Sequence, residues 1–275
     1  MTTAVVALLL VASMTAIGTA ATVDDFRGLV ARRGVVAGAV AVNVVLLPGL
    51  AVALVTAAAL RSEVALGVLL AAAAPGGGTG ALLTLHARGD LAMSAALQVA
   101  LAPAGLVSVP VWAAVAGQDV VPSGPAGLLL VGGGFLGQVV PLAVGMWLRR
   151  FRPGAAARAH RIARRVADVL LAGLVGYFVV TGVSRLPRVG WAGIGVIAVL
   201  VAVCLLPVAV PVPGSAARRR AVAMTTGVRN LTLGLFFAAS AAPTVVLTLL
   251  AYGLVMYAVL IPAAWVLARN GPQPV

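Results

Sequence analysis

Stretches of about twenty apolar residues recur along almost the whole chain, separated by short linkers. A helix needs roughly 20 mostly apolar residues to cross the hydrocarbon layer of a bilayer. We therefore predict an all-α polytopic membrane protein with nine transmembrane helices, the second kinked at Pro48. The predicted spans are Ala4–Ala21, Gly34–Leu60, Val64–Ala87, Leu91–Ala116, Pro125–Leu148, Val166–Val183, Gly190–Val210, Val222–Ala241 and Thr244–Leu267.

The composition excludes several classes of protein. Of the 275 residues, 62% are hydrophobic and only 9% are charged, whereas a soluble domain carries about 25% charged residues. A soluble enzyme, a disordered tail and a nucleic-acid-binding module are thereby excluded. Cys204 is the only cysteine, and His86 and His160 are the only histidines. The sequence therefore offers no disulfide and no cysteine metal cluster, and without paired carboxylates or a nucleophile motif we do not expect an enzyme.

The net charge of +13 comes from 19 basic residues, all of them arginine. If the loops alternate between two sides of a membrane, one side receives fifteen arginines and the other only Arg61, Arg185 and Arg188. Cytoplasmic loops carry such an excess. We therefore expect a multi-pass protein of the cell (inner or plasma) membrane with its N-terminus outside and its C-terminus in the cytoplasm. The net charge then reflects the orientation of the chain in the membrane and does not indicate a nucleic-acid partner.

By the same rule, the basic segment Phe151–Arg165 is interpreted as a cytoplasmic connector in preference to a lipid-binding amphipathic helix.

Two of the predicted spans are interrupted, the third by Pro75–Gly80 and the eighth by Thr225–Asn230. Unwound backbone at membrane depth survives only where it is buried in protein or lines a wet cavity. Interrupted helices in corresponding positions of two halves indicate inverted repeats with a binding site near the membrane midplane.

Arg229, the remaining arginine, falls inside the eighth span. A mid-span arginine costs roughly 2.5–3.5 kcal/mol on insertion scales and usually marks a pathway. An arginine beside a helix N-terminus suits a carboxylate or a sulfonate. We therefore predict that a small organic anion meets the backbone N–H groups of Gly78 and Thr79, with Arg229 and Asn230 opposite.

The motif Pro75-Gly76-Gly77-Gly78-Thr79-Gly80, followed by Ala87-Arg88-Gly89-Asp90-Leu91-Ala92-Met93-Ser94, resembles the bile acid:sodium symporter family. That family typically reads P-G-G-T-A-S-N and then A-R-G-(N/D)-x-A-L-S. Gly227-Val228-Arg229-Asn230 before Leu233 is similar to its E-x-G-x-Q-N-S-G-L segment. The resemblance implies inverted repeats of four and five helices whose two broken helices cross. It also implies a core domain (residues 34–116 and 190–267) that moves against a panel domain (residues 4–30 and 125–183).

The family resemblance implies sodium as a co-transported ion, but the corresponding positions depart from the family pattern. Gly80 and Ala81 replace its Ser-Asn ligands, Thr225 replaces its acidic ligand and Arg229 replaces a glutamine. One carboxylate with two sodium ions carries a net charge of about +1, as does Arg229 beside a neutral threonine. The hypothesis is that Arg229 permanently mimics the sodium-loaded state. The positions equivalent to the ion sites are Asn43, Gly80, Ala81, Ser94, Gln98, Thr225 and Thr226.

The sequence therefore predicts a secondary transporter of a small organic anion, with the lipid bilayer as its surroundings and no cofactor. Two alternatives stay open. One is a membrane sensor or partner subunit that does not transport. The other is an arsenite or auxin-type carrier on a similar fold; arsenite chemistry would favour a cysteine near the first break, and Cys204 lies elsewhere.

Overall fold

The computed structural model describes residues 3–22, 33–118, 120, 124–209, 214–239 and 241–269, and within these ranges it is helical without any strand. Residues 23–30 of the predicted panel domain and Val210, the predicted end of the seventh span, lie outside them. In chain order the helices are α1 (Thr3–Ala20), α3 (Arg33–Ala41), η1 (Val42–Leu46), α4 (Leu47–Ala57), α5 (Ser62–Ala72), α6 (Gly80–His86), α7 (Leu91–Val115), α8 (Pro125–Phe151), α9 (Pro153–Gly182), η2 (Val183–Arg188), α10 (Gly190–Val203), α11 (Leu206–Ala209), α12 (Ala216–Gly227), α13 (Leu231–Phe237) and α14 (Pro243–Arg269).

Five helical segments among the described residues are long and apolar enough to cross a membrane. They correspond to the second, fourth, fifth, seventh and ninth predicted spans, which confirms a multi-pass membrane protein. The full count of nine and the inverted repeats stay predictions. The five segments are Arg33–Ala57, Leu91–Val115, Pro125–Phe151, Gly190–Val208 and Pro243–Arg269.

The second span changes its helical geometry just before the predicted kink. A π-helical turn, η1, joins α3 to α4, and Pro48 lies in the first turn of α4. Proline has no N–H to donate to the carbonyl of Val44. That carbonyl instead accepts the indole N–H of Trp112 at 2.6 Å, which ties the turn to α7. Single π turns often lie at functional positions, and this one carries Asn43.

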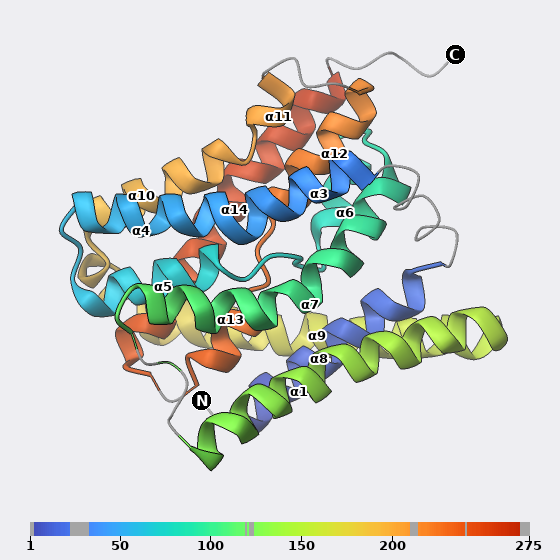
Figure 1. Ribbon diagram of the computed structural model, residues 1–275, viewed down its shortest axis with the longest axis horizontal. Helices are drawn as coiled ribbons and strands as arrows, with labels where there is room; N and C mark the ends of the chain where they lie inside the picture. Colours follow the sequence, from blue (N-terminus) through green and yellow to red (C-terminus); the bar gives the residue numbers. More distant parts are fainter. Residues whose placement is uncertain are drawn as a thin grey trace.

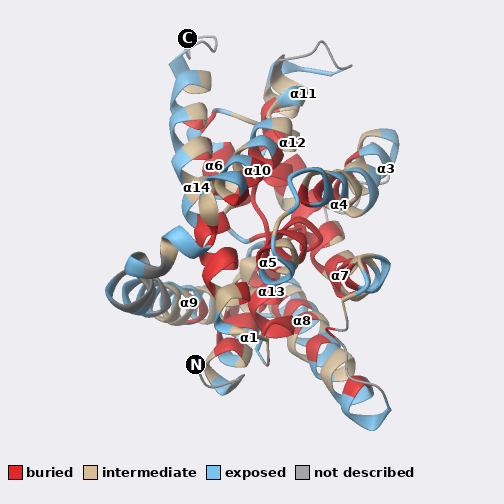
Figure 2. Ribbon diagram, turned by 90° about the vertical axis from the view of Figure 1, so that its left-hand side faces the viewer, coloured by how far each residue is buried: buried red, intermediate tan, exposed pale blue. Residues whose placement is uncertain are grey.

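Both predicted interruptions are present, and they lie against each other. Their bounds differ from the prediction, because Gly80 already begins α6 and Thr225, Thr226 and Gly227 still belong to α12. Residues 73–79 separate α5 from α6, and residues 228–230 separate α12 from α13. The N–H of Gly77 donates to the carbonyl of Val228 at 3.3 Å, and the N–H of Asn230 donates to that of Ala74 at 2.7 Å. Each break thus satisfies part of the other's backbone, as a membrane interior requires. The two extended segments lie in the middle of the molecule (Figure 1), where buried residues gather (Figure 2).

Two helices begin earlier than the hydropathy pattern predicts. The Ser215 hydroxyl accepts the N–H of Arg218 and caps α12, so the basic residues before Val222 are helical and not part of a loop. The segment Phe151–Arg165 is likewise not an irregular connector. Apart from a single non-helical residue at Arg152, it forms the end of α8 and the first half of α9.

Helices α1, α8 and α9 pack on one another and lie along one side of the molecule (Figure 1). His160 joins α9 to α1, because its Nδ1 lies 3.0 Å from the carbonyl oxygen of Ala16 and 3.2 Å from the hydroxyl of Thr19. Elsewhere α5 packs against α14, and α12 packs against α6 and α7. Helices α1, α8 and α9 correspond to the predicted panel, and the remaining α-helices correspond to the predicted core. The division into two domains stays a prediction.

Candidate functional site

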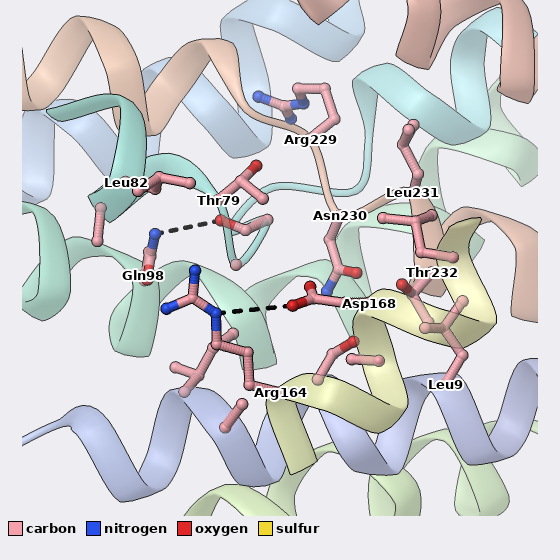
Figure 3. Close-up of a pocket in the computed structure, with 18 of the residues that line it drawn as sticks. Leu9, Thr79, Leu82, Gln98, Arg164, Asp168, Arg229, Asn230, Leu231 and Thr232 are labelled. Carbon is pink, nitrogen blue, oxygen red and sulfur yellow. Dashed lines mark hydrogen bonds and ion pairs between the residues drawn. The ribbon is translucent and has the colours of Figure 1, made fainter. Parts of the chain in front are cut away.

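A cavity of about 560 Å³ lies where the two breaks face α1, α9 and α14 (Figure 3). Four residues that the sequence assigned to substrate binding line it, namely Gly78, Thr79, Arg229 and Asn230, and Ala81 lines it too. The rest of the wall is largely apolar, with leucines contributed by most of the helices around it. Backbone and side chains from distant parts of the chain therefore meet at one concave site.

The guanidinium of Arg229 points away from this cavity (Figure 3). Its Nη1 donates to the Oδ1 of Asn43 at 2.7 Å and to the carbonyl of Thr226 at 3.0 Å. Its Nε donates to the carbonyl of Ala71 at 3.3 Å, and its Nη2 donates to that of Ala72. These four oxygens, from Asn43, Ala71, Ala72 and Thr226, form what we call the oxygen cage. The sequence placed the guanidinium opposite the anion, whereas in the structure it occupies the cage.

The cage exists because α5 ends inside the protein. The last carbonyl groups of a helix lack partners within it and carry the negative end of the helix dipole. Ala71 and Ala72 are the final residues of α5 and are buried, so their carbonyls favour a cation. Arg229 is itself only 2% exposed. Its guanidinium donates to carbonyl and amide oxygens and to no carboxylate among the described residues, so a full positive charge stays fixed beside the crossing.

Four of the ion-site positions, Asn43, Ser94, Thr225 and Thr226, form hydrogen-bonded pairs at or next to the cage. The hydroxyls of Ser94 and Thr225 lie 2.7 Å apart, and Thr84 donates to Ser94 at 3.2 Å. The Asn43 amide donates to the Thr226 hydroxyl at 3.0 Å. The structure thus brings together the predicted positions on three separate spans.

Gln98 and Gly80 complete this packing. The Gln98 amide donates to the carbonyl of Gly77 at 3.2 Å. A Cβ on Gly80 would lie 2.8 Å from the Gln98 Nε2 and 3.2 Å from the Thr225 Cα. The glycine therefore lets α6 approach α12 closely, at a position that offers no side-chain ligand to a cation.

These residues do not fit a sodium ion. Sodium is bound by oxygen atoms, but a guanidinium has donors only, and Arg229 already occupies the oxygens of the cage. Gly80 and Ala81 contribute no side-chain oxygen. The described residues also include no group of three or more His, Cys, Asp or Glu side chains that could hold a metal.

Asn230 supplies the polar group that does face the cavity. Its Oδ1 accepts the N–H of Leu233 at 3.1 Å and so caps α13. This bond turns the Nδ2 toward the cavity (Figure 3), where it is buried and has no hydrogen-bond partner among the described residues. Thr79 is positioned at the same site, with its hydroxyl 2.9 Å from that of Tyr257. A buried donor without a partner is costly, so the geometry favours a ligand that accepts hydrogen bonds.

Sequence reasoning missed the residues that α9 contributes. His160, Arg164 and Asp168 all line the cavity. They follow one another at intervals of four residues, which places them on one face of a helix. That spacing was the available signal, but it was hidden because His160 and Arg164 were assigned to a connector and Asp168 to the sixth predicted span.

A family model described as "Sodium Bile acid symporter family" matches residues 7–189. No curated protein matches the chain.

Proposed function

Because the chain belongs to the sodium bile acid symporter family, whose members are membrane transporters, we propose that it is a secondary transporter of a small organic anion. The transported group is a carboxylate or a sulfonate, and transport proceeds by alternating access. The observation that carries this proposal is the unpartnered Nδ2 of Asn230 in a largely apolar cavity at the crossing of two broken helices.

The anion binds where donors converge. Asn230 offers its amide N–H, and the backbone N–H groups of Gly78 and Thr79 have no backbone acceptor among the described residues. Arg229, the residue before Asn230, adds a fixed positive charge behind this wall, which favours an anion because charges interact strongly in a medium of low dielectric constant. The apolar wall accommodates the body of the substrate. On this proposal the core segments move against α1, α8 and α9 to expose the site to each side in turn.

Transport does not use sodium on this proposal. In the family pattern a glutamine stands at Arg229 and an acid stands at Thr225, and both contribute to sodium sites. Here the guanidinium supplies a tethered charge and the donors that the oxygen cage needs, so no ion from solution is needed to satisfy the carbonyl oxygens there. The protein lies in the cell membrane with its N-terminus outside and its C-terminus in the cytoplasm, as the distribution of arginines favours.

The full chain reconstituted in liposomes tests the function directly. The probes are labelled cholate, chosen because the family description includes bile acids, and labelled octanoate as a smaller carboxylate. Saturable uptake in choline buffer, inhibited by an excess of the unlabelled anion, supports the proposal. The absence of uptake of either probe would contradict it for these two carboxylates and favour a subunit that does not transport. Arsenite transport has less support, because the buried Cys204 is not among the residues that line the cavity.

A further inference from the structure

The charged residues of α9 that line the cavity have no role in the function proposed so far. Arg229 supplies charge from behind the wall, and its guanidinium is turned away. Arg164 is the other arginine that lines the cavity, and Asp168 lines it one helical turn further on. Figure 3 shows this pair between α1 and the crossing, on the side to which Asn230 points.

The resting pair is held weakly. The Nε of Arg164 lies 3.7 Å from the Oδ2 of Asp168, which is longer than a hydrogen bond. The two side chains are 57% and 68% exposed, and exposed pairs of this kind contribute little stability. The terminal nitrogens of Arg164 have no hydrogen-bond partner among the described residues. A planar guanidinium with free terminal nitrogens can accept a carboxylate or a sulfonate in a two-point contact.

We propose that Arg164 is the cavity's anion receptor on α9 and that Asp168 is a built-in competitor for it. In the empty protein the Asp168 carboxylate shields the Arg164 guanidinium. An entering organic anion displaces Asp168, pairs with Arg164 and reaches Asn230 from the opposite wall. This inference rests on the proposed function and deepens it, since it names the group that selects anions over neutral compounds of the same shape.

The proposal gives α9 a part in the transport cycle. Asn230 belongs to the crossing of the broken helices, whereas Arg164 belongs to the helices packed on α1. A single anion held by both residues joins the two groups of helices. The free energy of binding an anion then favours the state in which the two groups of helices lie close together. A neutral ligand does not pair with Arg164 and cannot provide this free energy.

Two substitutions separate this role from a structural one, because their expected effects have opposite signs. Arg164→Gln removes the receptor and weakens cholate binding by about tenfold, the loss of a charged hydrogen bond. Asp168→Asn removes the competitor but keeps the shape, and strengthens binding by about threefold, as expected for an exposed pair. A purely structural ion pair would give the same sign for both variants.

The experiment measures equilibrium binding of labelled cholate to the full chain in nanodiscs. Arg165→Gln is the matched control, because it removes the neighbouring charge from α9 at a residue that does not line the cavity, and it leaves binding unchanged. Methyl cholate, which lacks the charge, competes equally well with all variants. Arg164→Lys keeps the charge and restores part of the affinity.

The outcomes distinguish this inference from the function on which it rests. Opposite shifts for Arg164→Gln and Asp168→Asn support the inference. Equal shifts, or no shift in either variant while the unaltered chain binds cholate, overturn the inference and leave the proposed function in place. If the unaltered chain binds neither cholate nor octanoate, the proposed site and this inference are both overturned.

Discussion

At the scale of single residues, Arg229 shows that a buried cation must match its partners in shape as well as in the sign of its charge. Three of its side-chain nitrogens donate to four oxygens that belong to η1, α5 and α12. A planar guanidinium presents such a fork, whereas an ammonium is a compact point charge. The sequence identified both Arg229 and Asn43 as polar residues inside predicted spans. It could not predict that they meet, because the direction of the Arg229 side chain depends on where the carbonyl end of α5 lies.

Arg229→Lys keeps the positive charge but removes the planar set of N–H donors of the guanidinium. We expect the variant to be less stable by about 1–3 kcal/mol, because some of the buried carbonyls are left without donors. The measurement is thermal unfolding of the purified chain in detergent. Arg158→Lys, at an exposed position on α9, is the control and leaves the unfolding temperature unchanged. If Arg229→Lys is as stable as the original chain, the cage does not depend on the guanidinium shape.

At the scale of elements, the two breaks were predictable and their pairing was not. A proline with successive glycines indicated the first break, and a run of polar residues with one glycine indicated the second. The register in which Gly77 faces Val228 and Asn230 faces Ala74 depends on contacts between residues about 150 positions apart, which one sequence does not reveal. The early starts of α9 and α12 were missed for a different reason. Hydropathy reports which residues face lipid, and a charged helix is as regular as an apolar one.

Neighbouring glycines in the first break give a matched test of the pairing. A Cβ on Gly77 would overlap the carbonyl oxygen of Arg229, whereas a Cβ on Gly78 would lie 3.6 Å from the Cδ1 of Ile17, an ordinary contact. We expect Gly77→Ala to lower stability by about 1–3 kcal/mol, the usual cost of overpacking. Gly78→Ala keeps the stability and only narrows the cavity. Equal unfolding temperatures for the two variants would show that the breaks do not pack as described.

At the scale of the whole molecule, the arginines predict an orientation that the fold does not test. The described helices have apolar outer faces, including Leu128, Leu129 and Trp191, which are 77%, 76% and 91% exposed. Such faces suit a bilayer, but they would contact lipid equally well whether the N-terminus lies outside or in the cytoplasm. Only the distribution of charge between the loops distinguishes the two sides.

Labelling of introduced cysteines tests this orientation. The background is Cys204→Ser, which removes the single native thiol. Ser184 in η2 and Ala157 in α9 are both exposed and lie at opposite predicted sides. A membrane-impermeant maleimide should label Ser184→Cys in intact cells and Ala157→Cys only after permeabilisation. The reverse pattern would place the N-terminus in the cytoplasm.

The central claim is that the Arg229 guanidinium replaces a cation from solution. The most direct measurement is the initial rate of anion uptake into proteoliposomes with an inward sodium gradient, divided by the rate with choline in place of sodium. The account predicts a ratio near one for the unaltered chain, because the oxygen cage already holds its charge. A stimulation by sodium of about tenfold, equivalent to roughly 1.4 kcal/mol of coupling, would contradict it.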